Sequence, residues 1–356
     1  MDVNLDYVYN GTASGAVASM MANGGGMDPN LLRPWIGDDG RPYVTANEGG
    51  KPVARLAFNS NATLRKDEWK LLDQAIIEAA KPRLRAVADL MGAGLTFNIP
   101  NGMGKTVLET EAQSDITDAA ISMDGLRESE RDRPQYSLTN LPLPILHKDF
   151  NFSLRQIATS RNSGTPIDTT TAQLAGRRVA EGAEKLLLGT LGQYQFGGGT
   201  VYGYTNFPQR ITETVLDWTD RNITGAQITA NVIDMRQRSI NAFHYGPWML
   251  YVSTDFGVRL DEDYKAESDR TIRQRLEMLD GINGVRTLDY LPAKTVLLVQ
   301  MTSDVVREVI GMNIQTIQWE QSGGMQQNYK VMAIMVPQLR ADYNGNTGIV
   351  HGSVAT

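Results

Sequence analysis

The amino-acid sequence predicts a protein of the α+β class with a sizeable core. Three observations carry this prediction. Apolar residues recur at helical spacing in several segments. Other segments alternate apolar and polar residues with the two-residue period of a strand. The chain is 41% hydrophobic and 21% charged, as is usual for globular proteins. Its 356 residues are enough for a core divided over two lobes.

Residues 1–62 are the exception, because neither period persists there. They contain the glycine triplet 24–26 and four further glycines between positions 37 and 50. A segment this long without regular structure is uncommon inside a compact domain. We therefore expect an extended arm, either a loose tail or an arm that crosses onto neighbouring subunits.

The first helix is expected to begin near Thr63, with two acidic residues close to its first turn. Its apolar face continues at helical spacing to Leu90. Pro82 should kink this segment or divide it in two, since proline cannot continue the backbone ladder. Gly92 and Gly94 should end it.

A strongly charged stretch, residues 127–133 (RESERDR), interrupts the short strand-forming runs of residues 95–146. Opposite charges this dense are typical of a solvated hairpin tip. A second strand is expected at residues 145–157, where Phe150 and Phe152 lie on the apolar side.

A turn then directly precedes a capping box formed by Thr170 and Gln173. The helix that it opens should run to about Leu188, and Gly189 should close it. A glycine-rich hairpin is expected at residues 197–206.

From residue 224 to about 315 the pattern changes to helices that alternate with strands, which indicates a compact mixed lobe. The expected elements are two helices and two buried strands, at residues 228–242, 271–279, 248–253 and 295–300. The last expected element is a mostly apolar strand at residues 329–336, stopped by Pro337.

Composition excludes several classes of function. There is no cysteine, so disulfides and thiolate metal sites are excluded, and three scattered histidines make a histidine-rich metal centre improbable. A net charge of −6 argues against a tight duplex-DNA binder. No stretch reaches the ~20 apolar residues that span a bilayer, and the N-terminus lacks the features of a secretory signal. We expect no membrane contact, and a protein made in the cytoplasm.

The motifs that could carry chemistry fail on spacing. Gly104-Lys105-Thr106 ends like a phosphate-binding loop, but Ile99 stands where that motif needs its first glycine. The glycine triplet 197–199 lacks the third glycine of a dinucleotide fingerprint. No serine or histidine falls in a catalytic pattern. We expect no catalytic, cofactor-binding or metal-binding residues and no cofactor.

Several stretches together resemble a known family. Residues 141–155 (LPLPILHKDFNFSLR), then 164–168 (GTPID) and 180–189 (AEGAEKLLLG), are similar to encapsulins and related capsid proteins of tailed bacteriophages. In those proteins a proline-flanked strand ending an extended loop leads into a long spine helix. Residues 64–73 (LRKDEWKLLD) resemble the helix that opens the encapsulin shell domain, and residues 202–206 (YGYTN) resemble the turn after the spine helix.

The resemblance implies the Hong Kong 97 capsid fold. It divides the chain into an N-terminal arm (1–62), a peripheral domain (63–223) with an extended loop (115–167) and a spine helix (168–189), an axial domain (224–315), and a return strand of the peripheral domain with the C-terminal tail (316–356).

The function that the resemblance implies is that of a major capsid protein. Such a protein assembles in the host cytoplasm, as pentamers and hexamers, into the icosahedral shell of a virion. It encloses double-stranded DNA without sequence-specific contacts. Its partners are a scaffolding protein, a portal protein and in some cases a decoration protein.

Two alternatives stay open. The arm before the first helix favours a phage, but an encapsulin-like compartment that holds cargo enzymes would use the same shell. A soluble enzyme is the alternative from a different class. In a shell protein, the arm and the charged hairpin are expected to have no resting place on their own protomer. The candidate assembly residues are Arg127, Glu128, Glu130, Arg131, Asp132, Arg133, Lys148, Asp149 and Arg155.

Overall fold

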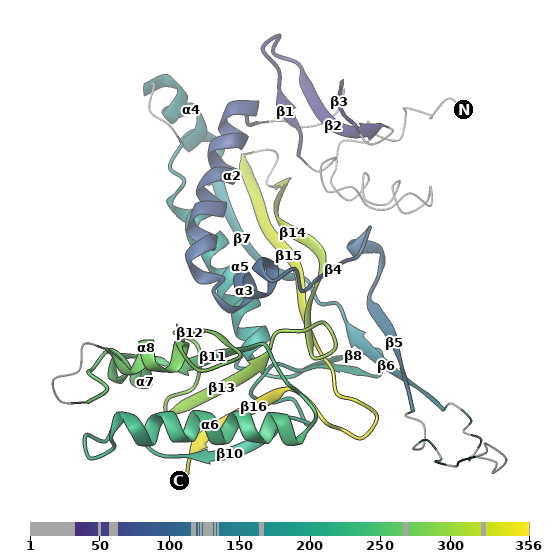
Figure 1. The fold of residues 1–356 in the computed structure, drawn as a ribbon. Helices are drawn as coiled ribbons and strands as arrows, with labels where there is room; N and C mark the ends of the chain where they lie inside the picture. The colour runs from purple at the N-terminus through teal and green to yellow at the C-terminus, as the bar shows by residue number, and fades with distance from the viewer. Residues whose placement is uncertain are drawn as a thin grey trace.

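The computed structural model describes residues 33–48, 51–56, 63–114, 135–163, 167–265, 270–321 and 325–355, together with residues 119, 121, 123, 131 and 133. The chain forms an upper and a lower lobe, and a two-stranded hairpin projects from the body between them (Figure 1). A small sheet from the N-terminal segment lies at the far end of the upper lobe (Figure 1).

The upper lobe is built on a four-stranded sheet in the order β4–β14–β15–β7. Its strands are β4 (Thr96–Asn98), β14 (Val306–Gln321), β15 (Gln326–Leu339) and β7 (Leu146–Ser153). Helix α5 (Thr170–Leu188) packs against β7 and β15, and α2 (Lys66–Ala80) packs against α5. The core between them is aromatic: Tyr329 stacks on Phe150 with ring centroids 5.2 Å apart and meets Trp69 edge-on at 5.8 Å.

The first helical segment divides at Pro82, as predicted, into α2, the 3₁₀ turn η3 (Lys81–Arg83) and α3 (Ala86–Gly92). The helix begins close to the predicted position, but Thr63 is not its cap, since α2 begins at Lys66 and its N-cap is Arg65. The Glu68 carboxylate accepts the Arg65 backbone N–H at 2.8 Å and so fixes the first turn there. Thr63 instead accepts a hydrogen bond from Gln318 of β14, at 2.9 Å.

Helix α5 has the predicted length, but the predicted capping box does not form. Asp168 takes the capping role instead, because its carboxylate accepts the Thr170 backbone N–H at 2.9 Å and the Thr170 hydroxyl at 2.6 Å. Gly176 explains how closely α5 approaches α2: a Cβ there would lie 2.7 Å from Cγ2 of Ile76. Only glycine fits at that distance.

The strand expected at residues 145–157 is shorter than predicted. Strand β7 ends at Ser153, and the chain continues as helix α4 (Leu154–Ser163). A reciprocal cap causes the change, since the Ser153 hydroxyl accepts the Gln156 N–H at 3.2 Å and the Gln156 side chain accepts the Ser153 N–H at 2.9 Å. The predicted inward side is confirmed, because Phe150 and Phe152 are both buried.

The lower lobe holds a five-stranded mixed sheet in the order β10–β16–β13–β11–β12. These strands are β10 (Ile211–Val215), β16 (Ile349–Val354), β13 (Thr295–Gln300), β11 (Trp248–Ser253) and β12 (Ile282–Leu288). Helices α6 (Gly225–Asn241), α7 (Thr254–Arg259) and α8 (Ile272–Glu277) complete it. The two helices and two strands expected in this lobe are confirmed. Strand β13 has core on both faces, with Val296 and Leu298 in one cluster and Leu297 and Val299 in the other.

Pro337 does not stop the last predicted strand, because β15 continues to Leu339. The proline pairs with Glu308 of β14, whereas β7 pairs with β15 only as far as Ala333. The missing N–H therefore falls where β15 has a single neighbouring strand, a position that tolerates proline.

The N-terminal segment was expected to contain no strands, yet its described part forms three. They are β1 (Trp35–Ile36), β2 (Pro42–Glu48) and β3 (Lys51–Leu56), in one antiparallel sheet. Trp35 stacks on Tyr43 with ring centroids 5.0 Å apart, which fixes the β1–β2 pair. The remaining elements are the hairpins β5 (Val107–Gln113) with β6 (Tyr136–Pro142) and β8 (Tyr194–Phe196) with β9 (Gly199–Val201), and the turn η4 (Gly102–Gly104).

Candidate assembly surfaces

The β5–β6 hairpin projects from the body (Figure 1), and most of the residues of β6 are exposed. Its strands pair in a simple register from Val107 opposite Pro142 to Gln113 opposite Tyr136. At its base Asn140 donates a hydrogen bond to the Gly197 carbonyl of the β8–β9 hairpin, at 3.0 Å. Two paired strands cannot bury a face by themselves. Away from its base, the hairpin therefore lacks a core.

One face of this hairpin is apolar and acidic. Tyr136 is 63% exposed and Leu138 is 65% exposed. Glu111 lies directly opposite Leu138, and Glu109 lies two residues earlier on the same side of β5. Beyond Leu108 and Leu141 at the base, the other face is small and polar, with the hydroxyls of Thr110 and Thr139 2.9 Å apart.

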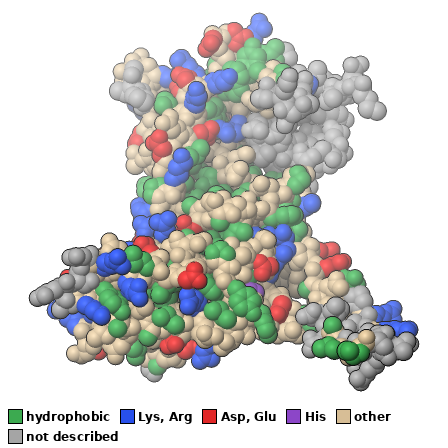
Figure 2. All heavy atoms as spheres, viewed as in Figure 1, with side chains coloured by type: hydrophobic (Ala, Val, Ile, Leu, Met, Phe, Trp, Pro, Cys, Tyr) green, Lys and Arg blue, Asp and Glu red, His purple; other side chains and the backbone are tan. Residues whose placement is uncertain are grey.

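The charged stretch at residues 127–133 lies in the connection between β5 and β6, so the predicted hairpin is confirmed at its two strands. Of the candidate residues, Arg127, Glu128, Glu130 and Asp132 lie outside the described residues. Arg131 and Arg133 are exposed, as are Ile121 and Met123 in the same connection. Figure 2 shows basic and hydrophobic side chains together at the lower right of the molecule, where this part of the chain projects.

The other candidates lie elsewhere. Lys148 and Asp149 are exposed on β7, the edge strand of the upper sheet. Asp149 lies 3.7 Å from the Lys330 ammonium and 3.8 Å from His147. Arg155 is exposed at the start of α4, which lies far from the β5–β6 strands (Figure 1). The described candidate residues therefore do not form one surface on a single protomer.

An arginine cluster on the flank of α5 was missed from the sequence. Glu181 is only 3% exposed and accepts hydrogen bonds from Arg177 at 2.7 Å and from Arg178 at 2.8 Å. Burial alone would raise the pKa of Glu181, but hydrogen bonds led by that from Arg177 hold the pKa below its ordinary value. Arg83 lies 4.0 Å from the same carboxylate. Two arginines three and four residues before a glutamate in a predicted helix were the available signal.

Asp289 extends this cluster to the lower lobe. Its carboxylate lies 3.9 Å from Arg83 and 3.4 Å from Arg85. Four guanidinium groups therefore surround two carboxylates. We define the arginine cluster as Arg83, Arg85, Arg177 and Arg178.

Two buried carboxylates mark the junction of the lobes. Glu184 of α5 is 2% exposed and accepts the backbone N–H groups of Ala86 and Val87, at 2.7 and 3.2 Å. Burial raises the pKa of Glu184 to about 7. Glu308 of β14 is fully buried, and neither of its carboxyl oxygens has a hydrogen-bond partner in the described part of the chain. Burial raises the pKa of Glu308 well above its ordinary value. Because both groups are closed off from solvent and have raised pKa values, their protonation is coupled to the stability of the folded chain.

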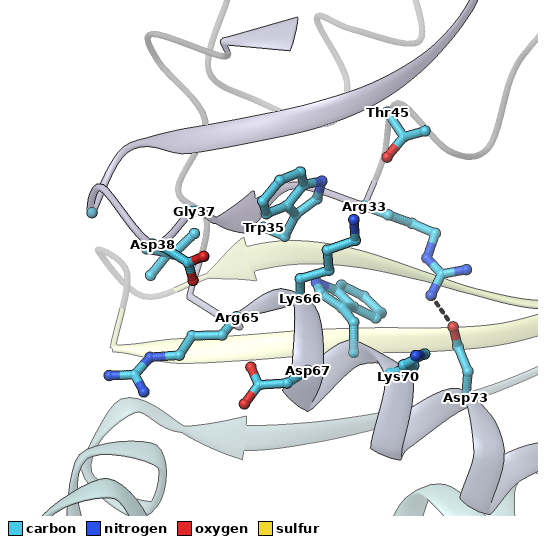
Figure 3. A pocket seen from close by; sticks show the side chains of 13 residues that line it. Arg33, Trp35, Gly37, Asp38, Thr45, Arg65, Lys66, Asp67, Lys70 and Asp73 are labelled. Atoms are coloured by element: carbon cyan, nitrogen blue, oxygen red, sulfur yellow. Dashed lines mark hydrogen bonds and ion pairs between the residues drawn. The ribbon is translucent and has the colours of Figure 1, made fainter. Parts of the chain in front are cut away.

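A hollow of about 1040 Å³ lies between the N-terminal sheet and α2 (Figure 3). Residues before β1 contact residues of α2 across this hollow: the Arg33 guanidinium lies over the Trp69 ring at 4.7 Å and forms an ion pair with Asp73. The Trp69 indole N–H donates to the Pro34 carbonyl at 3.0 Å. These contacts fix residues 33–36 on α2 of their own protomer, contrary to the expectation that the arm has no resting place there.

The turn η4, which ends at Gly104 of the phosphate-loop-like motif, packs against strand β14. A Cβ on Gly102 would lie 2.3 Å from the backbone oxygen of Gly311 in β14, so the turn η4 lies flat against that strand. Within the described ranges, no three histidine, aspartate or glutamate side chains are placed to hold a metal ion. Across the same residues, no helix has the length and apolar character needed to cross a membrane.

Solved structures share this fold. A virus-like particle from Pyrococcus furiosus matches with a TM-score of 0.58 at 16% identity, over 80% of this chain and 99% of that one. The capsid of a native GTA particle matches at 0.55 and 13% identity, over 77% and 92%. The capsid of the Myoviridae phage XM1 matches at 0.54 and 9% identity, over 72% and 89%. The fold is therefore the α+β Hong Kong 97 fold, and the predicted resemblance is confirmed.

The chain belongs to the DUF6260 family, which is described as a family of unknown function, and matches it over residues 59–352. A curated relative is the type 1 encapsulin shell protein EncA of Myxococcus xanthus, 23% identical over 210 residues. That match covers 57% of this chain and 65% of the relative, which is less than two thirds of its length.

Proposed function

We propose that this chain is the major capsid protein of a tailed phage and assembles into the icosahedral shell around its double-stranded DNA. The observation that carries the proposal is the projecting β5–β6 hairpin, whose Tyr136 and Leu138 are 63% and 65% exposed on a chain of the Hong Kong 97 fold. An exposed apolar surface of this kind is typical of a protein contact. The similar structures are named as capsids and a virus-like particle, which supports the same reading.

In this proposal, several modest contacts per subunit hold the shell. The upper lobe is the peripheral domain (63–223), with the extended loop (115–167) and the spine helix (168–189). The lower lobe is the axial domain (224–315), which meets its copies in pentamers and hexamers. Strand β14 runs through the boundary at residue 315, and the lower sheet also includes β10 from residues 63–223 and β16 from the tail (316–356). A specific interface typically buries about 1,200–2,000 Å² in total. Several such interfaces per subunit would together resist the internal pressure of the shell.

The charged stretch at residues 127–133 is proposed to form ion pairs across a subunit boundary. Lys148, Asp149 and Arg155 are proposed to lie in other contacts of the same shell. The proposed partners are scaffolding, portal and decoration proteins, with assembly in the host cytoplasm. DNA is enclosed without sequence-specific binding.

An encapsulin-like compartment is the second candidate. The observation in its favour is the curated relative, which is named as an encapsulin shell protein. The same fold would then enclose cargo enzymes in place of a genome. In both candidates the chain is structural and is not itself an enzyme.

Negative-stain microscopy and light scattering of the purified chain, alone and with its scaffolding protein, test the proposal. Closed particles are expected. Nuclease-resistant DNA in particles from infected cells supports a phage, and co-purifying enzymes support a compartment. A chain that stays small under all conditions and turns over a substrate would contradict both.

A further inference from the structure

We propose that Arg307 and Arg340 together bind a doubly charged oxyanion, and that inorganic phosphate is a ligand of this site. The two arginines lie at the end of the upper sheet where β14 and β15 approach the lower lobe. The inference goes beyond the proposed shell function and does not depend on it. It rests on two guanidinium groups that their own protomer brings together without a carboxylate.

The two arginines project from the same face of the upper sheet. Arg307 of β14 pairs with Gln338 of β15, and its Nε–H donates to Oε1 of Gln338 at 2.5 Å. Arg340 continues this ladder, since its backbone N–H donates to the Val305 carbonyl at 2.8 Å. Because side chains alternate along an extended chain, Arg340 lies on the face of Gln338, diagonally across from Arg307. Diagonal neighbours are about 7–8 Å apart, so two long side chains can close around one anion.

Neither guanidinium group is neutralised within the described part of the chain, because no carboxylate there lies within ion-pair distance of either group. Both side chains are partly buried, and burial lowers the pKa of each. The charge of Arg340 lowers the pKa of Arg307 further, whereas Asp304 acts on the pKa of Arg340 in the opposite direction without forming an ion pair. Two cations that repel each other in a partly desolvated place favour an anion between them.

Neighbouring side chains orient the Arg307 guanidinium. Phe97 of β4 lies against it at 4.3 Å. Gln338 is only 5% exposed, and its amide accepts from Arg307 on one side and donates to the Thr110 hydroxyl of β5 at 3.4 Å on the other. The two terminal nitrogens of Arg307 make no hydrogen bond among the described residues. A guanidinium held in this way presents N–H groups that match the oxygens of an oxyanion.

Charge decides which anion fits. A carboxylate or a single phosphate of a nucleic-acid backbone carries one negative charge and would leave one arginine uncompensated. The phosphate dianion compensates both, and its oxygens can accept from both guanidinium groups at once. Glu109 and Glu111 of the same protomer do not serve, because they alternate with Thr110 and project from the other face of the hairpin.

Titration calorimetry of the full-length chain with inorganic phosphate tests the site, at about pH 8, where phosphate is mainly dianionic. Phosphate should bind at least tenfold more tightly than acetate at the same ionic strength. Arg340→Gln should weaken phosphate binding at least tenfold. The matched control, Arg221→Gln, removes the same charge from an exposed position on the lower lobe and should leave binding unchanged. Acetate binding as tight as that of phosphate, or equal losses in the two variants, would overturn the proposal.

Thermal unfolding gives a second readout, which also controls for the fold. Phosphate should raise the unfolding temperature of the unmodified chain and of Arg221→Gln, because a ligand of the folded state stabilises that state. Phosphate should not raise the unfolding temperature of Arg340→Gln. Without phosphate, this variant should unfold no lower than the unmodified chain, since one of two repelling charges is gone.

A different pattern would contradict the site. If Arg340→Gln unfolds at a lower temperature and phosphate has no effect on the unmodified chain, Arg340 serves the fold alone. If a short DNA duplex binds through Arg340 while free phosphate does not, the ligand is a nucleic-acid backbone and the dianion is wrong.

Discussion

Helix α5 and the β5–β6 hairpin use apolar residues in opposite ways. In the second half of α5, Leu186, Leu187 and Leu188 are at most 2% exposed, whereas Tyr136 and Leu138 on the hairpin are more than 60% exposed. Burial of apolar surface stabilises whichever state removes it from water. These three leucines of α5 therefore stabilise the folded protomer, whereas Tyr136 and Leu138 can stabilise only an assembly. The four predictions below separate these two roles.

Leu187→Ala should have the largest effect on the protomer. Removing a fully buried leucine should lower the free energy of unfolding by about 2–5 kcal/mol. Leu138→Ala should change it by less than about 0.5 kcal/mol, because the side chain is already exposed. Denaturant unfolding of the dissociated protomer measures both. Equal losses of unfolding free energy in the two variants would show that the exposed and the buried leucine stabilise the protomer alike, contrary to the account.

Glu184→Gln tests the junction through pH. Because the folded-state pKa of Glu184 is raised to about 7, the folded chain keeps a proton that the unfolded chain loses near pH 4.5. The stability that this group contributes is therefore full below pH 4.5 and falls as pH rises to 7, by roughly 3 kcal/mol.

The measurement is the difference in unfolding free energy between the unmodified chain and Glu184→Gln from pH 4 to 8. The difference is needed because partial burial lowers the pKa of His351 to about 4, which gives the opposite slope in both chains. A difference that does not change with pH would show that Glu184 keeps its ordinary pKa.

Two glycines of α5 offer a matched pair. Gly176→Ala should cost about 1–3 kcal/mol of stability, since the new methyl group would lie 2.7 Å from Ile76. At Gly182 the methyl group would be 3.7 Å from Leu146, so Gly182→Ala should be neutral or stabilise by up to about 1 kcal/mol. Thermal unfolding gives both values. A stabilising Gly176→Ala would contradict the close approach of α2 and α5.

Reversing Arg131 and Arg133 to glutamate should have the smallest effect on the protomer. Both residues are exposed in the hairpin connection, so unfolding should change by less than about 0.5 kcal/mol. Particle yield should nevertheless fall, because the proposed ion pairs cross a subunit boundary. Intact assembly of this double variant, measured by light scattering, would show that the charged stretch does not take part in the subunit contact.

The sequence predicted the elements that carry a strong local signal. The break at Pro82, the length of α5 and the mostly apolar strands β11 and β13 follow from local chemistry and periodicity. Errors came where a neighbouring side chain decided the outcome. Asp168 capped α5 in place of Thr170, and the pair of Ser153 with Gln156 turned the end of a predicted strand into α4.

The missed features depend on contacts between distant segments. Strands β10, β12 and β16 mix polar residues or glycine with apolar ones, so their local sequence gives a weak strand signal and their neighbours in the sheet and core stabilise them. The arginine cluster joins η3, α5 and Asp289, residues up to 206 positions apart, from 83 to 289. The N-terminal strands were hidden because glycines near residue 40 were interpreted as breaking structure, whereas the Trp35–Tyr43 stack orders that segment.

Amide hydrogen exchange of the β5–β6 strands, compared between assembled particles and the dissociated protomer, tests the central claim most directly. If neighbouring subunits cover the hairpin, its amides near Leu138 should exchange at least a hundredfold more slowly in particles, while those in α5 change little. Slow and equal exchange of the hairpin in both states would show that the protomer alone stabilises it, and would contradict the shell account.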